Sequence, residues 1–442
     1  MIKRKDKIIT FFSIFQLTLH LHILKHTLKG KLKGKIAIGL SGGVDSSVAA
    51  WLLKQQGYDL LGLFMINWRE TAGTLSGDCP WEDDIIFAQL VARKLDIPFE
   101  VVDLSDSYHE RVINYMFEEY RCGRTPNPDV LCNREIKFDM FAHAAFDRGA
   151  SYVATGHYCR KETITVNGIE THRLLAGVDS GKDQSYFLCQ LSQQQLATAL
   201  FPIGHLIKSE VRRIADENGL ATARRKDSQG ICFVGKVDLP VFLQQKLEVK
   251  DGVIIEIPAN YDGFSEKNDI NQTSKTFSPK KTIKHQKCFY EKLKTLAMPY
   301  HFHPAHGRTV GKHHGAHFFT IGQRKGLNVG GMAEPLFVIG IDVENNIVYA
   351  GQGDHHPGLY HSALFVDAAD IHWVRHDLEI QPGDDRRMSV RVRYRQPLQD
   401  ATVFRLPEGM YILFDHPQRG ITPGQFAAWY SGCELVGSGV IN

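Results

Sequence analysis

The feature that most constrains the fold is a glycine-rich turn between an apolar strand and a helix. Residues 35–40 (KIAIGL) predict a buried strand, and the turn Ser41–Ser47 (SGGVDSS) leads into a helical stretch at 46–56 that Gly57 ends. Such a turn lets backbone N–H groups approach phosphate oxygens, and the helix N-terminus adds the positive end of its dipole. The Gly-Lys-Ser/Thr ending of a Walker loop is absent. The context favours a phosphate-binding loop over an ordinary Gly-Ser turn.

The segments after this turn continue the alternation of strands and helices. Strands are predicted at 60–66, 99–102 and 152–154, and helices at 81–95 and 134–148. This rhythm predicts an α/β fold with a Rossmann-like, doubly wound parallel sheet. A hairpin around Asn167-Gly168 and a mostly helical stretch to about residue 220 should follow it.

The second half of the chain has a different pattern. Residues 250–300 are rich in Lys, Asn and Ser, and we expect them to form an insertion or a long flexible excursion. From about residue 315 short β-branched runs alternate with turns, which predicts small β domains, the last one a β-barrel. A chain of 442 residues is too long for one core. We expect four parts: an N-terminal extension at 1–32, a catalytic domain at 33–228, a small central domain with the insertion at 229–360, and the barrel at 361–442.

Composition and cysteine usage narrow the class of protein. The net charge is only +3, so a nucleic-acid surface would have to come from local clustering. None of the eight cysteines forms a Cys-x-x-Cys pair, which argues against a zinc ribbon and favours a reducing, cytoplasmic location. The apolar stretch at 11–24 loosely resembles a secretory signal, but polar residues interrupt it and no small-residue cleavage site follows. We therefore expect an extension and not a signal.

Six further segments resemble the motifs of one family. Together with the Ser41–Ser47 loop they occur in order over roughly residues 33–442: TPNPDVLCNREIKF at 125–138, KDQSYF at 182–187, DSQGICFVG at 227–235, FTIGQRKG at 319–326, RYRQ at 393–396 and TPGQ at 422–425. The set resembles the tRNA 2-thiouridine synthases, which belong to the ATP pyrophosphatase (adenine nucleotide alpha hydrolase) type. The first 30 or so residues have no counterpart in the usual pattern of the family, and the 250–300 stretch is longer than that pattern predicts.

This resemblance implies an activity, cofactors and partners. The expected enzyme is a tRNA-uridine 2-sulfurtransferase that adenylates the C2 oxygen of the wobble uridine of tRNA Lys, Glu and Gln and replaces it with sulfur from a cysteine persulfide. Its cofactors would be ATP and Mg²⁺. Its partners would be tRNA and a sulfur donor protein, either a cysteine desulfurase or a sulfur relay protein, with no membrane.

The resemblance also assigns the catalytic and base-binding residues. Cys132 matches the nucleophile and Cys232 the persulfide carrier, and we expect a Cys132–Cys232 disulfide during turnover. Asn127, Pro128 and Asp129 match the contacts to a uridine flipped out of its stack, and Asp129 is close enough in sequence to accept a proton. A following helix with Arg134 and Lys137 favours the thiolate of Cys132, and the cations at 224–226 favour that of Cys232. For the other six cysteines we expect small buried apolar side chains.

The remaining assignments concern ATP and tRNA. The ATP contacts implied are Gly39, Leu40, Ser41, Gly42, Gly43, Val44, Asp45, Ser46, Met65 and Gly156. Asp45 is a candidate ligand of the magnesium that accompanies ATP. Core packing remains open for Met65, and a plain turn for Gly156. The tRNA contacts implied are Lys182, Asp183, Gln184, Arg393 and Tyr394.

Two further patterns concern the arginines near 390 and the histidines near 310. Along a strand at 387–395, four arginines recur on one face and apolar residues on the other, which predicts a cationic face for phosphates or a merely solvated one. The histidines between 301 and 317 fit no ligand spacing, so no protein metal cage is expected.

Three alternatives to this function stay open at this point. They are another ATP pyrophosphatase-type synthetase that forms amides, a different RNA thiolase, and an RNA-binding module without catalysis. The intact loop and the two motif cysteines favour the uridine thiolation.

Overall fold

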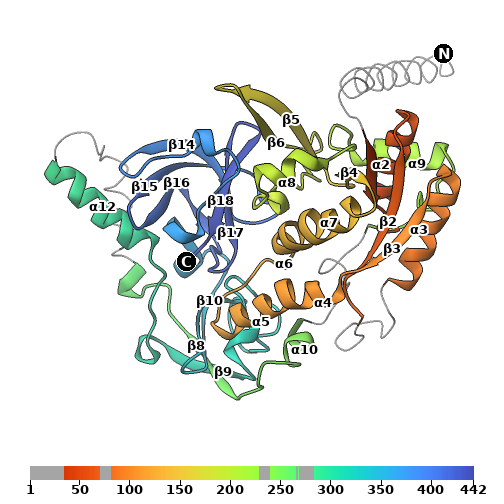
Figure 1. Cartoon of the computed structure of the whole chain (residues 1–442). Coiled ribbons are helices and arrows are strands. Elements are labelled where there is room, and N and C mark those ends of the chain that lie inside the picture. Colours follow the sequence, from red (N-terminus) through yellow and green to blue (C-terminus); the bar gives the residue numbers. More distant parts are fainter. Residues whose placement is uncertain (1–33, 70–80, 228–238, 265–266, 268–282) are drawn as a thin grey trace, which may run out of the picture.

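The computed structural model describes residues 34–69, 81–227, 239–264, 267 and 283–442. An α/β unit and a β-barrel lie at opposite ends of the molecule, and a smaller sheet lies below both (Figure 1). The expected extension at 1–32 and the cysteines Cys79 and Cys232 lie outside the described residues. No described helix is long and apolar enough to span a bilayer.

A five-stranded parallel sheet forms the centre of the α/β unit and confirms the predicted fold class. Its strand order is β3-β2-β1-β4-β7. The strands are β1 Lys35–Gly39, β2 Leu60–Ile66, β3 Phe99–Asp103, β4 Ala150–Ala154 and β7 Ala199–Leu200. The order reverses between β1 and β4, and ligands of such sheets bind outside the carboxyl ends of the strands at this switch point.

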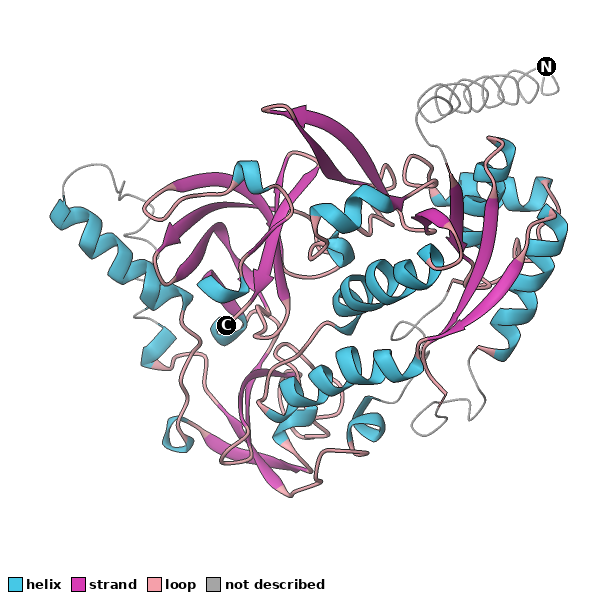
Figure 2. Cartoon of the chain, in the orientation of Figure 1, coloured by secondary structure: helices cyan, strands magenta, loops and turns pink. Residues whose placement is uncertain are grey.

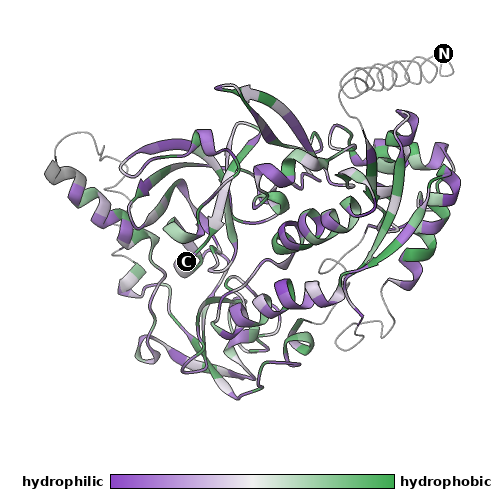
Figure 3. Cartoon of the chain, in the orientation of Figure 1, coloured by the Kyte–Doolittle hydropathy of each residue, from purple (hydrophilic) through white to green (hydrophobic). Residues whose placement is uncertain are grey.

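Helices cover both faces of the sheet because both faces are apolar (Figures 2 and 3). Ile36 and Ile38 of β1 pack with one helix layer, whereas Ala37 between them packs with the other. The first layer contains α2 Val44–Gln55, α3 Glu82–Leu95 and α9 Lys208–Glu217. The second contains α4 Ser105–Tyr108, η1 His109–Ile113, α5 Asn114–Arg121 and α7 Phe141–Phe146.

The helix expected at 134–148 starts earlier than predicted. It is one helical run made of α6 Pro128–Leu131, the π-helical η2 Cys132–Met140, and α7. Asn127 caps it by accepting a hydrogen bond from the Val130 N–H at 3.3 Å, and Pro128 occupies the first helical position. The Pro-Asn-Pro-Asp sequence is therefore the cap and first turn of a helix and not a separate turn before it.

The predicted hairpin is confirmed, but its sheet lies in the other half of the molecule. β5 Cys159–Val166 and β6 Ile169–Ala176 pair across Asn167 and Gly168, which both have positive φ. β6 then pairs with β18 of the barrel. The hairpin thus extends the barrel sheet, a pairing between residues about 260 apart in the sequence that local pattern could not predict.

The C-terminal strands form the expected barrel domain. The sheet runs in the order β12-β16-β15-β14-β17-β18-β6-β5, with β13 paired to β18. Its C-terminal strands are β12 Tyr360–Asp367, β13 His372–Trp373, β14 Asp385–Arg391, β15 Gln399–Leu406, β16 Gly409–Arg419, β17 Phe426–Ser431 and β18 Glu434–Val440.

The central sheet corrects the expectation of an insertion at 250–300. Its order is β10-β11-β8-β9, with β8 Gly252–Glu256, β9 Arg308–His313, β10 Leu336–Asp342 and β11 Ile347–Gln352. β8 lies inside this sheet, so residues 252–256 are not an excursion. Five residues are too short a pattern to stand out in a polar stretch.

A second part of the 250–300 stretch is a helix, α12 Ile283–Ala297. Its buried residues Phe289, Leu293 and Leu296 recur at helical spacing, and Phe289 packs on Phe404 of the barrel at 5.2 Å. This apolar stripe packs the otherwise polar helix α12 against the barrel.

Short helices complete the chain. They are η3 Ser185–Leu188, α8 Gln193–Thr198, α10 Leu239–Leu243, η4 Pro304–His306, η5 Ala316–Phe318, η6 Pro357–Leu359, η7 Ala368–Asp370 and η8 His376–Leu378.

Candidate active site

Three backbone segments meet at the switch point with no room for side chains. Gly42 has φ +72°, and a Cβ there would lie 2.4 Å from the Asp84 carbonyl oxygen. A Cβ on Gly156, just after β4, would lie 2.6 Å from the Ser46 nitrogen. Both positions therefore require glycine because of close backbone approach, and Gly156 is more than a plain turn glycine.

The Ser41–Ser47 loop is held by its own hydroxyl groups. The Ser41 N–H donates to Ser46 Oγ at 3.2 Å, and Ser46 Oγ and Ser47 Oγ donate to the Gly43 carbonyl at 3.1 and 2.8 Å. Gly43 caps α2 without a side chain. The first turn of α2 thus presents backbone N–H groups and the positive end of the helix dipole, which suits a phosphate.

The Asp45 carboxylate, expected as a magnesium ligand, is bound by two side chains. It accepts a hydrogen bond from the Tyr158 hydroxyl at 2.7 Å, and Lys208 Nζ contacts both of its oxygens at 2.7 and 2.9 Å. Burial and the neighbouring Asp45 raise the pKa of Tyr158, so the phenol stays a neutral donor. Sequence reasoning missed Lys208 and Tyr158 because they lie 163 and 113 residues from Asp45.

A second carboxylate, Asp227, joins three cations beside the loop. It contacts Lys182 Nζ at 2.7 Å, Lys208 Nζ at 2.9 Å and the Arg212 guanidinium at 2.7 Å. Burial alone would raise the Asp227 pKa, but hydrogen bonds from Lys182 and Lys208 outweigh it and lower the pKa to about 2. Asp227 is therefore ionised at neutral pH and binds these cations as a charge.

The helix that carries Cys132 packs beside the loop. A Cβ on Gly39 would lie 3.6 Å from the Phe141 ring, and the Phe138 ring lies 6.1 Å from the ring of His157, next to Gly156. The structure thus brings the predicted nucleotide loop and the predicted nucleophile segment to the same edge of the sheet. Met65, at the end of β2, is buried there in the core.

Cys132 itself lies deeper in the helix than expected. It is fully buried and begins the π-helical segment, one turn after the helix start at Pro128. The expectation that it precedes the helix is therefore wrong, although wide π-helical turns are frequent at functional sites. Asp129 is half-buried in the turn before it, and its carbonyl accepts from Asn133 Nδ2 at 2.9 Å. The expected partner of Cys132, Cys232, lies outside the described residues.

The predicted base-binding segment is held by loops of the other two domains. The Gln425 amide donates to the carbonyls of Thr125 and Pro126 at 2.9 Å each, and its oxygen accepts from Asn127 Nδ2 at 3.3 Å. Thr125 Oγ1 also contacts Thr320 Oγ1 at 3.2 Å. Three motifs recognised separately in the sequence, at 125–138, 319–326 and 422–425, therefore form one structure.

The predicted tRNA-contact segment at 182–184 makes internal contacts. Lys182 binds Asp227, and the Gln184 side chain accepts from the Tyr158 N–H at 3.0 Å. Asp183 is buried and accepts from Arg391 at 2.9 Å. These contacts support the walls of the Asp45 site, and a role in tRNA binding stays a prediction.

The expectation of a cationic strand face at 387–395 is wrong. β14 ends at Arg391, whose side chain is only 10% exposed, and the chain turns at Arg395 with φ +66°. Arg393 donates to the Ile321 carbonyl and to Thr422 Oγ1, at 3.2 and 2.9 Å, and the Tyr394 ring packs on Phe187 at 4.3 Å. The predicted alternation of exposed arginines and buried apolar residues fails at Arg391, because its side chain points into the interior and binds Asp183 there.

The buried Arg391–Asp183 pair gives the first prediction. Arg391→Met should lower the free energy of unfolding by about 3–5 kcal/mol because it leaves the Asp183 charge buried without its partner. The exposed Arg395→Met should leave stability within about 0.5 kcal/mol of wild type. Urea unfolding measures both, and equal midpoints in the two variants would contradict the importance of the pair.

The other cysteines are only partly as expected. Cys159 and Cys189 are buried, and burial raises the pKa of both thiols, that of Cys189 to about 12. Cys122, Cys288 and Cys433 are exposed, so the expectation of burial is wrong for these three. A single cysteine in a polar segment carries no periodic signal of its burial.

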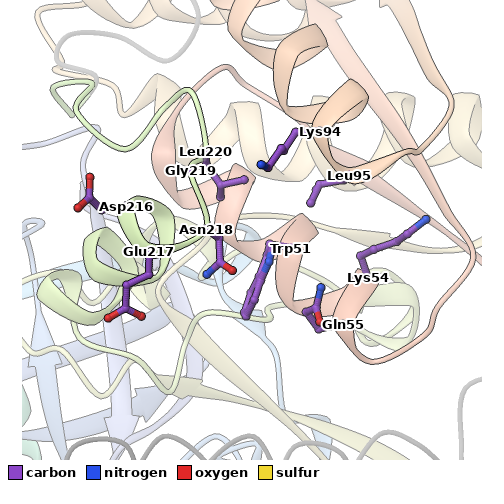
Figure 4. Close-up of a pocket in the computed structure, with 10 residues that line it drawn as sticks. All are labelled: Trp51, Lys54, Gln55, Lys94, Leu95, Asp216, Glu217, Asn218, Gly219 and Leu220. Atoms are coloured by element: carbon purple, nitrogen blue, oxygen red, sulfur yellow. The ribbon is translucent and has the colours of Figure 1, made fainter. Parts of the chain in front are cut away.

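A pocket of about 680 Å³ lies away from the loop (Figure 4). Trp51, Lys54 and Gln55 line it from the last turn of α2, and the C-terminal ends of α3 and α9 close it. Trp51, the lining residue of α2 nearest the loop, lies seven residues after Val44, or about 10 Å along the helix. It is therefore not part of the site at the switch point.

The fold and the site together define an α/β enzyme of the ATP pyrophosphatase type, with two β domains that hold its cysteine-bearing segment. Three family models match the chain: a tRNA methyl transferase HUP domain at 34–236, a tRNA methyl transferase PRC-barrel domain at 299–352, and an aminomethyltransferase beta-barrel domain at 365–441.

Curated relatives identify the family. The tRNA-specific 2-thiouridylase MnmA of Christiangramia forsetii is 56% identical over 92% of this chain and 99% of its own length. That of Flavobacterium johnsoniae is 55% identical over the same shares. This chain belongs to the tRNA-specific 2-thiouridylase family. A solved 4-thiouridine synthetase–RNA complex with bound ATP matches at 17% identity over 48% of this chain and 50% of its own, with a TM-score of 0.29.

Proposed function

We propose that this protein is a tRNA-uridine 2-sulfurtransferase that uses ATP to replace the C2 oxygen of the wobble uridine with sulfur. The observation that supports the proposal is that the helix carrying Cys132 packs at the switch point, through Phe141 beside Gly39, which leads into the loop, and through Phe138 beside His157. An enzyme that joins adenylation to sulfur transfer needs a phosphate site and a thiol side by side. Relatives 55–56% identical over almost their whole length carry the name of this activity.

ATP serves to make the C2 oxygen a leaving group. Transfer of AMP to that oxygen cleaves ATP between the α and β phosphates and turns a poor leaving group into a phosphate ester. The N–H groups at the start of α2 would hold the phosphates. Methyl transfer, named in the family-model descriptions, has no use for such a step.

The residues at the loop fit a magnesium ion bound with ATP. Mg²⁺ in nucleotide sites is held by one or two carboxylates and by phosphate oxygens, and Asp45 supplies a carboxylate at the loop. The ion would neutralise phosphate charge there. Lys208 and Tyr158 contact the Asp45 oxygens, so the ion would share this carboxylate with them.

Two cysteines then exchange sulfur. The Cys132 thiolate attacks the inner sulfur of a Cys232 persulfide, the persulfide S–S bond breaks, and hydrosulfide leaves. Hydrosulfide attacks C2 of the uridine, AMP departs with the oxygen, and Asp129 accepts the proton. The products are 2-thiouridine, AMP and a Cys132–Cys232 disulfide, and a thiol reductant supplies two electrons to reset the enzyme.

Partners and location follow from this chemistry. The base is reached by Asn127, Pro128 and Asp129 after it leaves its stack, with tRNA Lys, Glu and Gln as substrates. Lys182, Asp183, Gln184, Arg393 and Tyr394 would form the tRNA-contact region, in which the buried Asp183 would hold the segment through Arg391 and would not touch the tRNA itself. A cysteine desulfurase or a sulfur relay protein would load Cys232. The cytoplasm suits both tRNA and the exposed thiols of Cys122, Cys288 and Cys433.

Reconstitution tests this function. The full chain should convert the wobble uridine of unmodified tRNA Lys to 2-thiouridine when ATP, Mg²⁺, a cysteine desulfurase, cysteine and dithiothreitol are present. Mass spectrometry of the nucleosides measures the product, with reactions lacking ATP or desulfurase as controls. Formation of 4-thiouridine instead of 2-thiouridine, or of no thiolated uridine at all, would overturn the proposal.

A further inference from the structure

The segment that leads into the Cys132 helix takes its backbone hydrogen bonds from the barrel. Residues 124–127 form no helix or strand. The amide nitrogen of the Gln425 side chain donates to the carbonyls of Thr125 and Pro126, at 2.9 Å each. Because backbone carbonyls that leave water need a donor, this one side chain does for the segment what a neighbouring strand does inside a sheet.

Two further contacts bring the backbone of the segment against the barrel loop. The Thr125 N–H donates to the Pro423 carbonyl at 2.9 Å. Gly424 has φ +90°, and a Cβ there would lie 2.9 Å from the Thr125 carbonyl oxygen. This approach requires glycine at that position, so the loop before Gln425 is shaped to hold the segment closely.

Gln425 also fixes the cap of the helix. Its Oε1 accepts from Asn127 Nδ2 at 3.3 Å, and Asn127 Oδ1 accepts from the Val130 N–H at 3.3 Å. Neither amide can turn around, because Gln425 has to direct its nitrogen at two carbonyls and Asn127 has to direct its oxygen at an N–H. Gln425 therefore sets the orientation of the Asn127 side chain and, through it, the first turn of α6, which carries Asp129.

The barrel holds Gln425 through the buried Thr422. The Gln425 N–H donates to the Thr422 carbonyl at 3.2 Å, and the Gln425 carbonyl accepts from the Ile441 N–H at 2.8 Å. Arg393, an expected tRNA contact, donates to Thr422 Oγ1 at 2.9 Å. Contacts thus run without a break from this arginine through Thr422 and Gln425 to the segment expected to meet the uridine.

We propose that Gln425 is a positioning residue for the target uridine. It holds residues 125–127 and the cap of α6 in the arrangement that presents Asp129 and Cys132 to the base, and so makes the base site depend on the barrel. The inference rests on the proposed function, the thiolation of a tRNA uridine. A reacting group held about 1 Å out of place reacts much more slowly, so the loss of Gln425 should act on the step after tRNA has bound.

The kinetic test measures tRNA-dependent pyrophosphate release by the full chain with unmodified tRNA Lys. Gln425→Met keeps the length of the side chain and removes its polar atoms. We expect kcat to fall about 30-fold, while KM for tRNA and the affinity for ATP without tRNA each change less than about 3-fold. Gln425→Glu keeps the shape too, but a carboxylate cannot donate to the two carbonyls, so it should lose about as much activity as Gln425→Met.

Gln193→Met is the matched control. The Gln193 amide nitrogen also donates to two carbonyls, those of His172 and Val374, at 2.8 and 2.6 Å, and its oxygen accepts the His172 N–H at 2.8 Å. It thus joins the hairpin to the barrel with the same pattern of bonds, without contact to the base segment. Gln193→Met should lose a similar amount of stability and keep the wild-type kcat.

Hydrogen exchange, followed by mass spectrometry of peptides from residues 124–134, tests the positioning without any activity. Exchange should be faster in Gln425→Met and unchanged in Gln193→Met. Unchanged exchange in Gln425→Met, a kcat within about 2-fold of wild type in Gln425→Glu, or an equal loss of kcat in Gln193→Met would overturn the inference. Faster exchange in Gln425→Met of a chain that makes no 2-thiouridine would refute the proposed function and leave intact the role of Gln425 in holding the segment.

Discussion

Replacing either Cys132 or Cys232 with serine should lower the rate of 2-thiouridine formation at least about 1000-fold while AMP transfer to tRNA continues. A serine hydroxyl cannot carry a persulfide or attack one at neutral pH, whereas adenylation uses only ATP and the uridine oxygen. Single-turnover reactions with radiolabelled ATP and isolated tRNA separate the two steps. Both variants should accumulate adenylated tRNA.

Cys433→Ser is the control for the loss of a thiol, because Cys433 is exposed in the turn between β17 and β18. It should thiolate at the wild-type rate. Non-reducing peptide mapping of the wild-type enzyme after one turnover should show a Cys132–Cys232 disulfide. Normal thiolation by Cys232→Ser would exclude the persulfide assignment. Activity in Cys132→Ser would show instead that sulfur reaches the base without the disulfide step.

Gly42→Val should abolish tRNA-dependent pyrophosphate release, by about 100-fold or more, while tRNA still binds. A Cβ at Gly42 would lie 2.4 Å from the carbonyl oxygen of Asp84, a backbone atom that cannot move aside without shifting α3. The loop must then leave its phosphate-binding conformation. Pyrophosphate release in the presence of tRNA measures the first effect, and gel-shift titration measures the second.

Gly57→Val controls for backbone strain in this comparison. Gly57 also has positive φ, at +82°, so valine is strained there too, but its Cβ would meet no atom within 4 Å. Both variants should lose stability, and only Gly42→Val should lose the chemistry. Equal pyrophosphate release in the two variants would exclude the loop at 41–47 as the phosphate site.

The local sequence pattern was sufficient to predict those strands and turns whose characteristic residues lie within a few positions of one another. The strand at 35–39, the loop after it and the strand at 60–66 are short apolar runs or glycine turns, and they lie where the sequence predicts them. Their side-chain environment is uniform along the segment, because a parallel strand is buried on both faces. The helix start at Pro128 was missed because a proline reads equally as a turn residue and as a first helical residue.

The motifs at 125–138, 319–326 and 422–425 are visible in the sequence as separate signals. That Gln425 holds Thr125 and Pro126 is visible only in the fold, because it depends on contacts about 300 residues apart. The same holds for Arg391. The sequence pattern placed it on a cationic face, whereas in the fold it is buried and bound to Asp183.

By itself the sequence determined the kind of fold, and its motifs predict the phosphate loop and the two cysteines, since each depends on residue type at close spacing. The tertiary structure alone decided which charges meet at the loop. Lys208, Asp227 and Asp45 come from three distant segments, and electrostatic pairing acts through space over a few ångströms regardless of distance along the chain.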